Sequence, residues 1–265
     1  MIMRPMGRMA PPGRRAGLAA DFPMSFQAAN IGLLALGDTG WGDELLAGCL
    51  VTLELAACAL LVGLILGLLL AGAKLSRSFL LRGFGEIYTA FIRATPEFLI
   101  LLLFYYGIEQ AVQSALDLVG VSVRFEMPRF LAAVIGLAAI FAAYAAEVFR
   151  GAYLAVPLGQ IEAGIACGMS DWQVFGRIRL PQMWRFAIPG LGNLWMVLLK
   201  DTSLAAVIAV DDLLRQAKIG SETTRAPLTF YLAAGALYLL LTGLSDAARE
   251  QLERRAQRGM ARAAA

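Results

Sequence analysis

The sequence contains no histidine and only three cysteines among its 265 residues. Cys49, Cys58 and Cys167 lack the close spacing of metal-binding cysteines, so we expect no metal site and no imidazole chemistry. A G-x-x-x-x-G-K-S/T segment is also absent, and an ATP-driven cycle would therefore need a separate ATPase chain. No nucleophile stands with a base or a metal cluster, which argues against a membrane-embedded enzyme. The net charge of +3 gives no reason to expect a nucleic-acid partner.

Apolar residues are abundant in this sequence. They make up 59% of the chain against 16% charged residues, and the mean hydropathy of +0.67 is too high for an ordinary soluble domain. Uncharged runs of 19 residues over 55–73 and 20 residues over 226–245 each match the roughly 20 residues that a helix needs to cross a bilayer. Three further apolar stretches are shorter or contain one or two charges. We predict an all-α integral membrane protein with five transmembrane helices, near 46–73, 88–113, 129–150, 186–210 and 226–247.

Five spans place the two chain ends on opposite sides of the membrane, and lysine and arginine are more frequent on the cytoplasmic side. The loops 74–93 and 148–185, together with the C-terminal tail, hold 13 of these residues, against nine on the opposite face. We therefore predict that the loop 148–185 and the C-terminus are cytoplasmic.

The chain divides into three regions by composition. We expect an N-terminal extension over 1–40, a transmembrane domain over 41–250 and a cytoplasmic tail over 251–265. Residues 1–24 are rich in proline, glycine and arginine and lack the apolar core of a signal peptide, so we expect disorder there, with Met24 as an alternative translation start. Without these residues the opposite face holds five lysines and arginines, and the charge asymmetry increases.

The segment 159–181 is a polar, glycine-punctuated stretch between two long apolar runs. Residues 160–167 are good helix formers, Gly168 permits the left-handed conformation that ends a helix, and Ser170 can cap a second helix. Pro181 is predicted to end that second helix. The apolar side chains that this arrangement leaves outside the bilayer are Met169, Trp172, Val174 and Phe175. An ordinary turn between two spans is the alternative, but such turns are usually far shorter.

The same segment resembles a known motif. Glu162-Ala163, then Gly168, then Ile178-x-Leu180-Pro181 have the spacing of the EAA loop of bacterial ABC importer permeases. Gly164 stands where that motif usually has its second alanine, a change that costs helix propensity of about 1 kcal/mol. Because the other positions match, we identify the segment as an EAA-type coupling loop.

Three further segments extend the resemblance. Residues 92–96, 144–151 and 200–204 resemble, in family order, the RGTP, AYxxExFRG and KDTSL signatures of polar amino-acid permeases, with Ala94 in place of the glycine of the first. Residues 40–55 and 72–76 look most like the histidine, basic amino-acid and opine branch. The resemblance covers about residues 40 to 255.

The resemblance implies a type I ABC importer permease of the bacterial inner membrane. The positions that would bind the ATPase are Glu162, Ala163, Gly168, Met169, Trp172, Ile178, Leu180 and Pro181. The expected partners are two copies of an ATP-binding subunit, which use ATP and Mg, a second permease subunit, a periplasmic substrate-binding protein and the lipid bilayer. The histidine-type branch pairs two different permeases, which favours a heterodimer and leaves a homodimer open. This chain is expected to bind no cofactor itself and to carry a basic amino acid, histidine or an opine.

Acidic residues inside the predicted spans are costly unless they face a partner or water, and each is a candidate for the substrate path. They are Glu54, Glu97, Glu147 and Asp201. An acid on the path would compensate the charge of a cationic substrate. The alternatives are that Glu147 pairs with Arg150 one helical turn away and that Lys200 pairs with a neighbouring acid. We interpret Arg93 and Arg150 as anchors at the membrane boundary rather than substrate contacts.

Two interpretations stay open from the sequence. Gly63-x-x-x-Gly67 is a candidate for close helix packing, although glycine is also frequent in membrane helices for other reasons. An ATP-independent exchanger or channel could be built from the same intramembrane charges. Such a protein would have no reason to expose a glycine-hinged loop with apolar side chains, so we favour the permease.

Overall fold

The structure is a computed structural model that describes residues 31–37, 40–121 and 123–256. Our predictions for residues 1–24 and for the end of the C-terminal tail lie outside these ranges. All regular secondary structure in the described ranges is helical. The elements are η1 (Ile31–Leu34), α1 (Gly42–Leu75), α2 (Phe79–Ala94), α3 (Glu97–Leu118), α4 (Arg129–Leu154), α5 (Leu158–Ala166), α6 (Asp171–Val174), η2 (Phe175–Arg179), α7 (Leu180–Asp201), η3 (Thr202–Ile208), α8 (Leu213–Thr224) and α9 (Pro227–Ala256).

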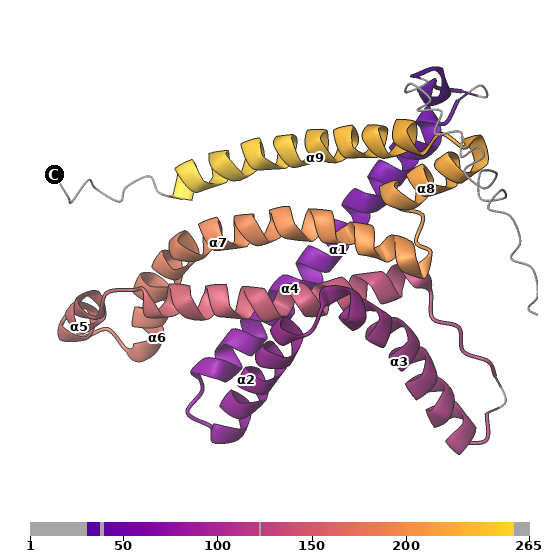
Figure 1. Ribbon diagram of the computed structural model, residues 1–265. Helices are drawn as coiled ribbons and strands as arrows, with labels where there is room; N and C mark the ends of the chain where they lie inside the picture. Colours follow the sequence, from indigo (N-terminus) through magenta and orange to yellow (C-terminus); the bar gives the residue numbers. More distant parts are fainter. Residues whose placement is uncertain (1–30, 38–39, 122, 257–265) are drawn as a thin grey trace, which may run out of the picture.

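Five helical segments in the described part of the chain are long and apolar enough to cross a membrane, as predicted. They are α1, α3, α4, the continuous segment Asp171–Ile208 and α9. The most buried of the five is α4, in which 72% of the most apolar stretch of the helix lies inside the protein. Figure 1 shows α7 lying alongside α4 with α9 beyond it, while α1 crosses these helices obliquely. The fold is therefore a helical membrane bundle built around α4.

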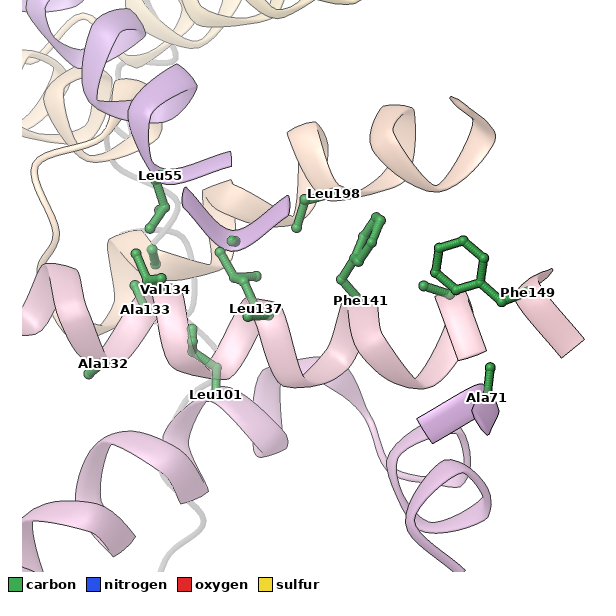
Figure 2. Close-up of a cluster of buried hydrophobic side chains, with 14 of the residues drawn as sticks. Leu55, Ala71, Leu101, Ala132, Ala133, Val134, Leu137, Phe141, Phe149 and Leu198 are labelled. Carbon is green, nitrogen blue, oxygen red and sulfur yellow. The ribbon is translucent and has the colours of Figure 1, made fainter. Parts of the chain in front are cut away.

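The contact between α1 and α4 is the most extensive in the bundle. A β-carbon added at Gly63 would lie 2.7 Å from Cδ1 of Phe141, and one added at Gly67 would lie 2.8 Å from Cβ of Ala145. The two helices meet at small residues, which confirms the predicted role of the Gly63-x-x-x-Gly67 pair in close packing. Figure 2 shows the larger core side chains of α4, among them Leu137 and Phe141, beside residues of α1, α3 and α7.

The second predicted span, 88–113, is wrong as a single helix. The chain breaks at Thr95 and Pro96, where α2 ends and α3 begins. Proline disfavours a helical conformation at the residue before it, and Thr95 is extended with ψ of 138°. Figure 1 shows α2 and α3 diverging from a point beside α4. Because of this break, Glu97 lies in the first turn of α3 rather than in the middle of a span.

Pro181 does not end the second coupling helix, contrary to our prediction. It lies in the first turn of α7, and the helical path continues from Asp171 through Asp201. The turn before it is a π-helix, in which the Leu180 N–H donates to the carbonyl of Phe175 five residues back. The π-turn interrupts the regular i to i−4 hydrogen bonding just before Pro181, and this accommodates a residue that has no N–H to donate. The coupling segment is thus joined to the fourth span without a break, and that span begins earlier than the predicted residue 186.

Candidate functional site: coupling loop and acidic path

The coupling loop has the predicted helix, glycine hinge and helix. Helix α5 ends just before Gly168, which has a φ of +82°, in the left-handed region that favours glycine. Ser170 then caps α6: its hydroxyl accepts from the Gln173 N–H at 3.4 Å, and the Gln173 side chain accepts from the Ser170 N–H at 3.0 Å. This reciprocal pair is a capping box, which fixes the start of the second helix.

Gly164 allows the two arms of the loop to pack closely. It is buried in α5, and a β-carbon there would lie 2.6 Å from Cδ1 of Ile178 and 3.3 Å from Cγ2 of Val174. Val174, one of the four apolar side chains that we expected outside the bilayer, is also buried and packs within the loop rather than on its surface. Gly164 therefore has a packing role that the sequence did not reveal.

The outer surface of the loop carries a large aromatic side chain. Trp172 is 80% exposed and stacks on Phe175 with ring centroids 5.7 Å apart. Glu162, Ala163, Gly168 and Pro181 are also exposed, whereas Met169, Ile178 and Leu180 are half-buried. An exposed tryptophan on a rigid, capped helix is typical of a protein interface.

The second arm of the loop is tied to the end of α4. The Arg179 guanidinium donates to the Tyr153 hydroxyl, and its central carbon lies 4.2 Å from the centre of the Tyr153 ring. The amide of Gln182 also donates to Gln160 at 2.6 Å, linking the start of α7 to α5. A displacement of the loop would therefore be transmitted to both α4 and α7.

Two of the predicted path acids come together at the break between α2 and α3. Glu97 in the first turn of α3 and Asp201 at the end of α7 line one small cavity of about 20 Å³, together with Tyr144 of α4. The carboxyl groups of Glu97 and Asp201 interact with one another, and Glu97 also interacts with Tyr144. Two like charges at this range repel unless a cation or a shared proton lies between them. The pair is thus arranged to receive positive charge.

A cation lies over the ring of Tyr144. Arg93, at the end of α2, places its guanidinium carbon 5.6 Å from the centre of the Tyr144 ring, and its side chain is 48% exposed. Lys200 forms no ion pair within 4.0 Å in the residues that the structure describes. Our alternative for Lys200, pairing with a neighbouring acid, therefore finds no salt bridge.

Glu147 lies in a different environment. Its carboxylate accepts from Arg150 Nε at 3.0 Å, as the alternative interpretation predicted, and it also pairs with Lys74 and lies 4.0 Å from Arg93. The sequence analysis treated Lys74 as a loop residue, but it is buried in the last turn of α1. No local signal distinguishes it, because any lysine at the end of an apolar run could reach the membrane surface.

Glu54 stays apart from the other acids. It is exposed on α1, and its neighbours on that helix, Leu50 and Leu61, are 62% and 63% exposed. Twenty residues separate it from Lys74, which is about 30 Å along a helix. It has no ion pair within the described ranges.

Asp212, outside the spans, is a buried acid that the sequence analysis missed. It caps α8 by accepting from the Arg215 N–H at 3.0 Å, and its second oxygen is buried with no hydrogen-bond partner. Burial raises its pKa from 3.8 to about 6, a shift that hydrogen bonds from backbone N–H groups, led by that of Arg215, partly offset.

The fold and these sites together define a class: a polytopic helical membrane protein with a capped, glycine-hinged helical loop and two acids at a broken span. The chain belongs to the family of binding-protein-dependent transport system inner membrane components, whose profile matches residues 63–258. It is a membrane-spanning transport subunit, and membership of this family implies that it works with an ATPase and other components of an ABC transporter.

Relatives support the same assignment. The nopaline transport system permease protein of Agrobacterium fabrum is 43% identical over 232 residues, which cover 87% of this chain and 98% of that protein. The histidine/lysine/arginine/ornithine transport system permease protein of Escherichia coli is 39% identical over 224 residues, covering 84% of this chain and 98% of that protein. A crystal structure of an amino acid ABC transporter with histidines matches with a TM-score of 0.71 and 31% identity, over 81% of this chain and 95% of that one.

Proposed function

We propose that this chain forms half of the translocation path of an ATP-driven importer for basic amino acids, histidine or opines in a bacterial inner membrane. The observation that carries the proposal is the Glu97–Asp201 pair at the broken span. A cationic side chain that leaves water loses its hydration, and carboxylates in the path compensate that loss. The names of the relatives, which include nopaline, histidine, lysine and arginine transport, support this substrate class.

The arrangement around Tyr144 also suits the rest of an amino acid. Arg93 is half-exposed and lies over the ring of Tyr144, which lines the same cavity as the two acids. A guanidinium binds a carboxylate through two parallel hydrogen bonds. Arg93 can therefore pair with the substrate carboxylate while Glu97 and Asp201 hold a cationic group. Glu147 and Glu54 stay candidates for the path, with weaker support because Glu147 has its own cations and Glu54 lies apart.

The proposed cycle uses partners that bind the coupling loop. Two copies of an ATP-binding subunit would hydrolyse ATP with Mg, each permease docking one copy through its loop, and this chain would bind no cofactor. The docking residues are Glu162, Ala163, Gly168, Met169, Trp172, Ile178, Leu180 and Pro181. A second, different permease would complete the path, and a periplasmic binding protein would deliver substrate. Closure of the ATPases would draw the loops together and open the cavity outward, and hydrolysis would return it inward.

Uptake by the reconstituted complex tests the substrate class. Proteoliposomes holding this chain, its partners and ATP should import radiolabelled arginine, and Glu97→Gln or Asp201→Asn should lower that uptake about tenfold without loss of the ATPase. Glu44→Gln, which removes an exposed acid at the start of α1, is the matched control and should transport normally. Wild-type uptake by both path variants would contradict the assignment. Uptake without ATP would instead favour an exchanger or channel.

The orientation has a separate test. The proposed cytoplasmic C-terminus rests on the excess of lysine and arginine on that face. A reporter that is active only in the cytoplasm, fused after Ala265, should be active. Activity of a periplasm-specific reporter at the same position would overturn the orientation and the cytoplasmic placement of the coupling loop together.

A further inference from the structure

Lys74 is a buried cation shared by three helices. It lies in the last turn of α1, and its side chain is 1% exposed. Its ammonium group donates to Thr89 Oγ1 on α2 at 2.8 Å and to Glu147 Oε1 on α4, and it forms an ion pair with Glu86 Oε2 on α2 at 2.9 Å. Two of the three ammonium donors thus have hydrogen-bond acceptors, and the carboxylates of Glu86 and Glu147 compensate the charge. Removal of a partner from a buried charge is strongly destabilising, so the three helices are held in the arrangement that keeps these partners around Lys74.

The surrounding residues are suited to this arrangement. The Thr89 hydroxyl donates to the carbonyl of Gly85 at 2.9 Å, which leaves its lone pairs free to accept from Lys74. A β-carbon at Gly85 would lie 2.6 Å from Cγ of Lys74, so glycine leaves the space that the lysine stem occupies. Arg150 pairs with the second oxygen of Glu147 and completes the charge compensation.

Helix α2 has few other attachments to the bundle. Its buried residues are Gly85, Thr89 and Ile92, and Tyr88 adds a hydrogen bond to the carbonyl of Ala139 at 3.1 Å. Its outward side chains, Leu80, Phe84, Ile87 and Phe91, are all more than half exposed. The Lys74 contacts therefore supply the ionic link between α1 and α2 and the shorter of two ionic links to Glu147 on α4, the other being Arg93 of α2 at 4.0 Å.

The two helices that Lys74 joins lead to the two functional regions. Helix α4 continues into the coupling loop, whose Arg179 binds Tyr153 near the end of α4. Helix α2 ends at the break beside Glu97 and carries Arg93 in its last turn. A movement of α4 that is passed to α2 would move Arg93 and the start of α3 relative to Asp201.

We propose that Lys74 is a positioning residue that couples displacement of the coupling loop to the acidic path, through Glu147 on α4 and through Glu86 and Thr89 on α2. This inference rests on the proposed function for its transport consequence, but the mechanical link itself does not depend on the substrate. Two sites are coupled when both influence the position of one structural element. The contacts of Lys74 join α2 and α4 into such an element, which the coupling loop and the acidic path can both displace.

Hydrogen exchange measured by mass spectrometry on the complete transporter tests the link without a substrate. In the wild type, ATP should change exchange in both α5 and α2. In Lys74→Met, α5 should still respond to ATP, while the response of α2 should be lost. Arg77→Met removes an exposed cation three residues away and should behave as the wild type. An unchanged α2 response in Lys74→Met would overturn the proposal, whatever the transported substrate. So would an α2 response lost in both variants, because the effect would then follow from net charge.

Substrate-stimulated ATP hydrolysis gives the functional readout. Lys74→Met should reduce the stimulation by a basic amino acid about tenfold while basal hydrolysis and complex yield persist. Lys74→Met combined with Glu147→Gln should be no worse than the more damaging single change, because both residues act through one contact. Multiplicative effects would contradict the shared path. A wild type that responds to no basic amino acid, histidine or opine would refute the proposed substrate class alone, since the exchange experiment still decides the link.

A milder variant covers the case in which Lys74→Met does not fold. Thr89→Val keeps the side-chain shape and removes one of the two hydrogen-bond acceptors of Lys74. It should weaken the α2 response to ATP and the substrate stimulation partially, with normal assembly. Full wild-type responses in Thr89→Val would contradict the role of the α2 contacts.

Discussion

Replacement of Gly67 by alanine should push α1 away from α4. The new β-carbon would lie 2.8 Å from Cβ of Ala145 and 3.3 Å from the carbonyl oxygen of Ala142. Carbon atoms in favourable contact lie about 3.5–4.0 Å apart, so the methyl group would be roughly 0.7–1.2 Å too close. Neither contacted atom belongs to the far end of a flexible side chain. The two helices must therefore separate along the most extensive interface of the bundle.

The magnitude follows from the cost of overpacking. An extra methyl group in a close-packed core typically costs about 1–3 kcal/mol. Gly72, in the same helix, is a matched control because a β-carbon there would meet nothing within 4 Å. Gly72→Ala should be neutral or stabilise the protein by up to about 1 kcal/mol through helix propensity. Because Gly67→Ala gains the same helix propensity, this gain cancels, and the two variants should differ in free energy of unfolding by roughly 1–3 kcal/mol, with Gly67→Ala the less stable.

Unfolding of the purified protein in mixed micelles, followed by the fluorescence of its four tryptophans, measures this difference. Equal unfolding curves for Gly67→Ala and Gly72→Ala would refute the reasoning. They would mean that α1 and α4 are not held at the close distance seen in the structure, or that α4 shifts at no cost.

Three other changes test separate features. The Gly168→Asp variant should insert normally but lose its ATPase in a pull-down, because a side chain at a φ of +82° is strained by about 1 kcal/mol or more and the added charge would be buried at the interface. The control is Gly159→Asp, which has open space around it. Retention of the ATPase by Gly168→Asp would contradict the docking role. Asp212→Asn should raise the melting temperature at pH 8 but not at pH 4. Because the pKa of Asp212 is raised to about 6 in the folded protein, its contribution to stability is present below its ordinary pKa, and up to about 3 kcal/mol of folding free energy is lost as pH rises through 6. The same change in melting temperature at both pH values would show that its burial does not control its charge. Arg179→Gln should weaken substrate-stimulated ATP hydrolysis while the ATPase stays bound, since the stacking on Tyr153 is lost; full stimulation would argue against transmission through the end of α4.

Local chemistry in the sequence predicted a large part of this protein. The number of spans follows from five apolar stretches, two of them uncharged over bilayer length, because the burial of apolar residues and the internal satisfaction of backbone hydrogen bonds leave few alternatives. The coupling loop was predicted at the level of single residues: Gly168 is left-handed and Ser170 forms its cap. Glycine conformation and helix capping depend on a few neighbouring residues, so no distant part of the chain is needed to specify them.

Tertiary structure decided what depends on contacts between distant segments. A proline is the local signal both at the break beside Pro96 and in the continuous helix through Pro181. The π-turn before Pro181 accommodates the backbone N–H that proline lacks, whereas the chain before Pro96 is extended. The meeting of Glu97 with Asp201 joins residues more than 100 positions apart, and the burial of Lys74 needs acceptors from two other helices. A sequence gives the charge of each residue, but its electrostatic partners are set by how the helices pack around α4.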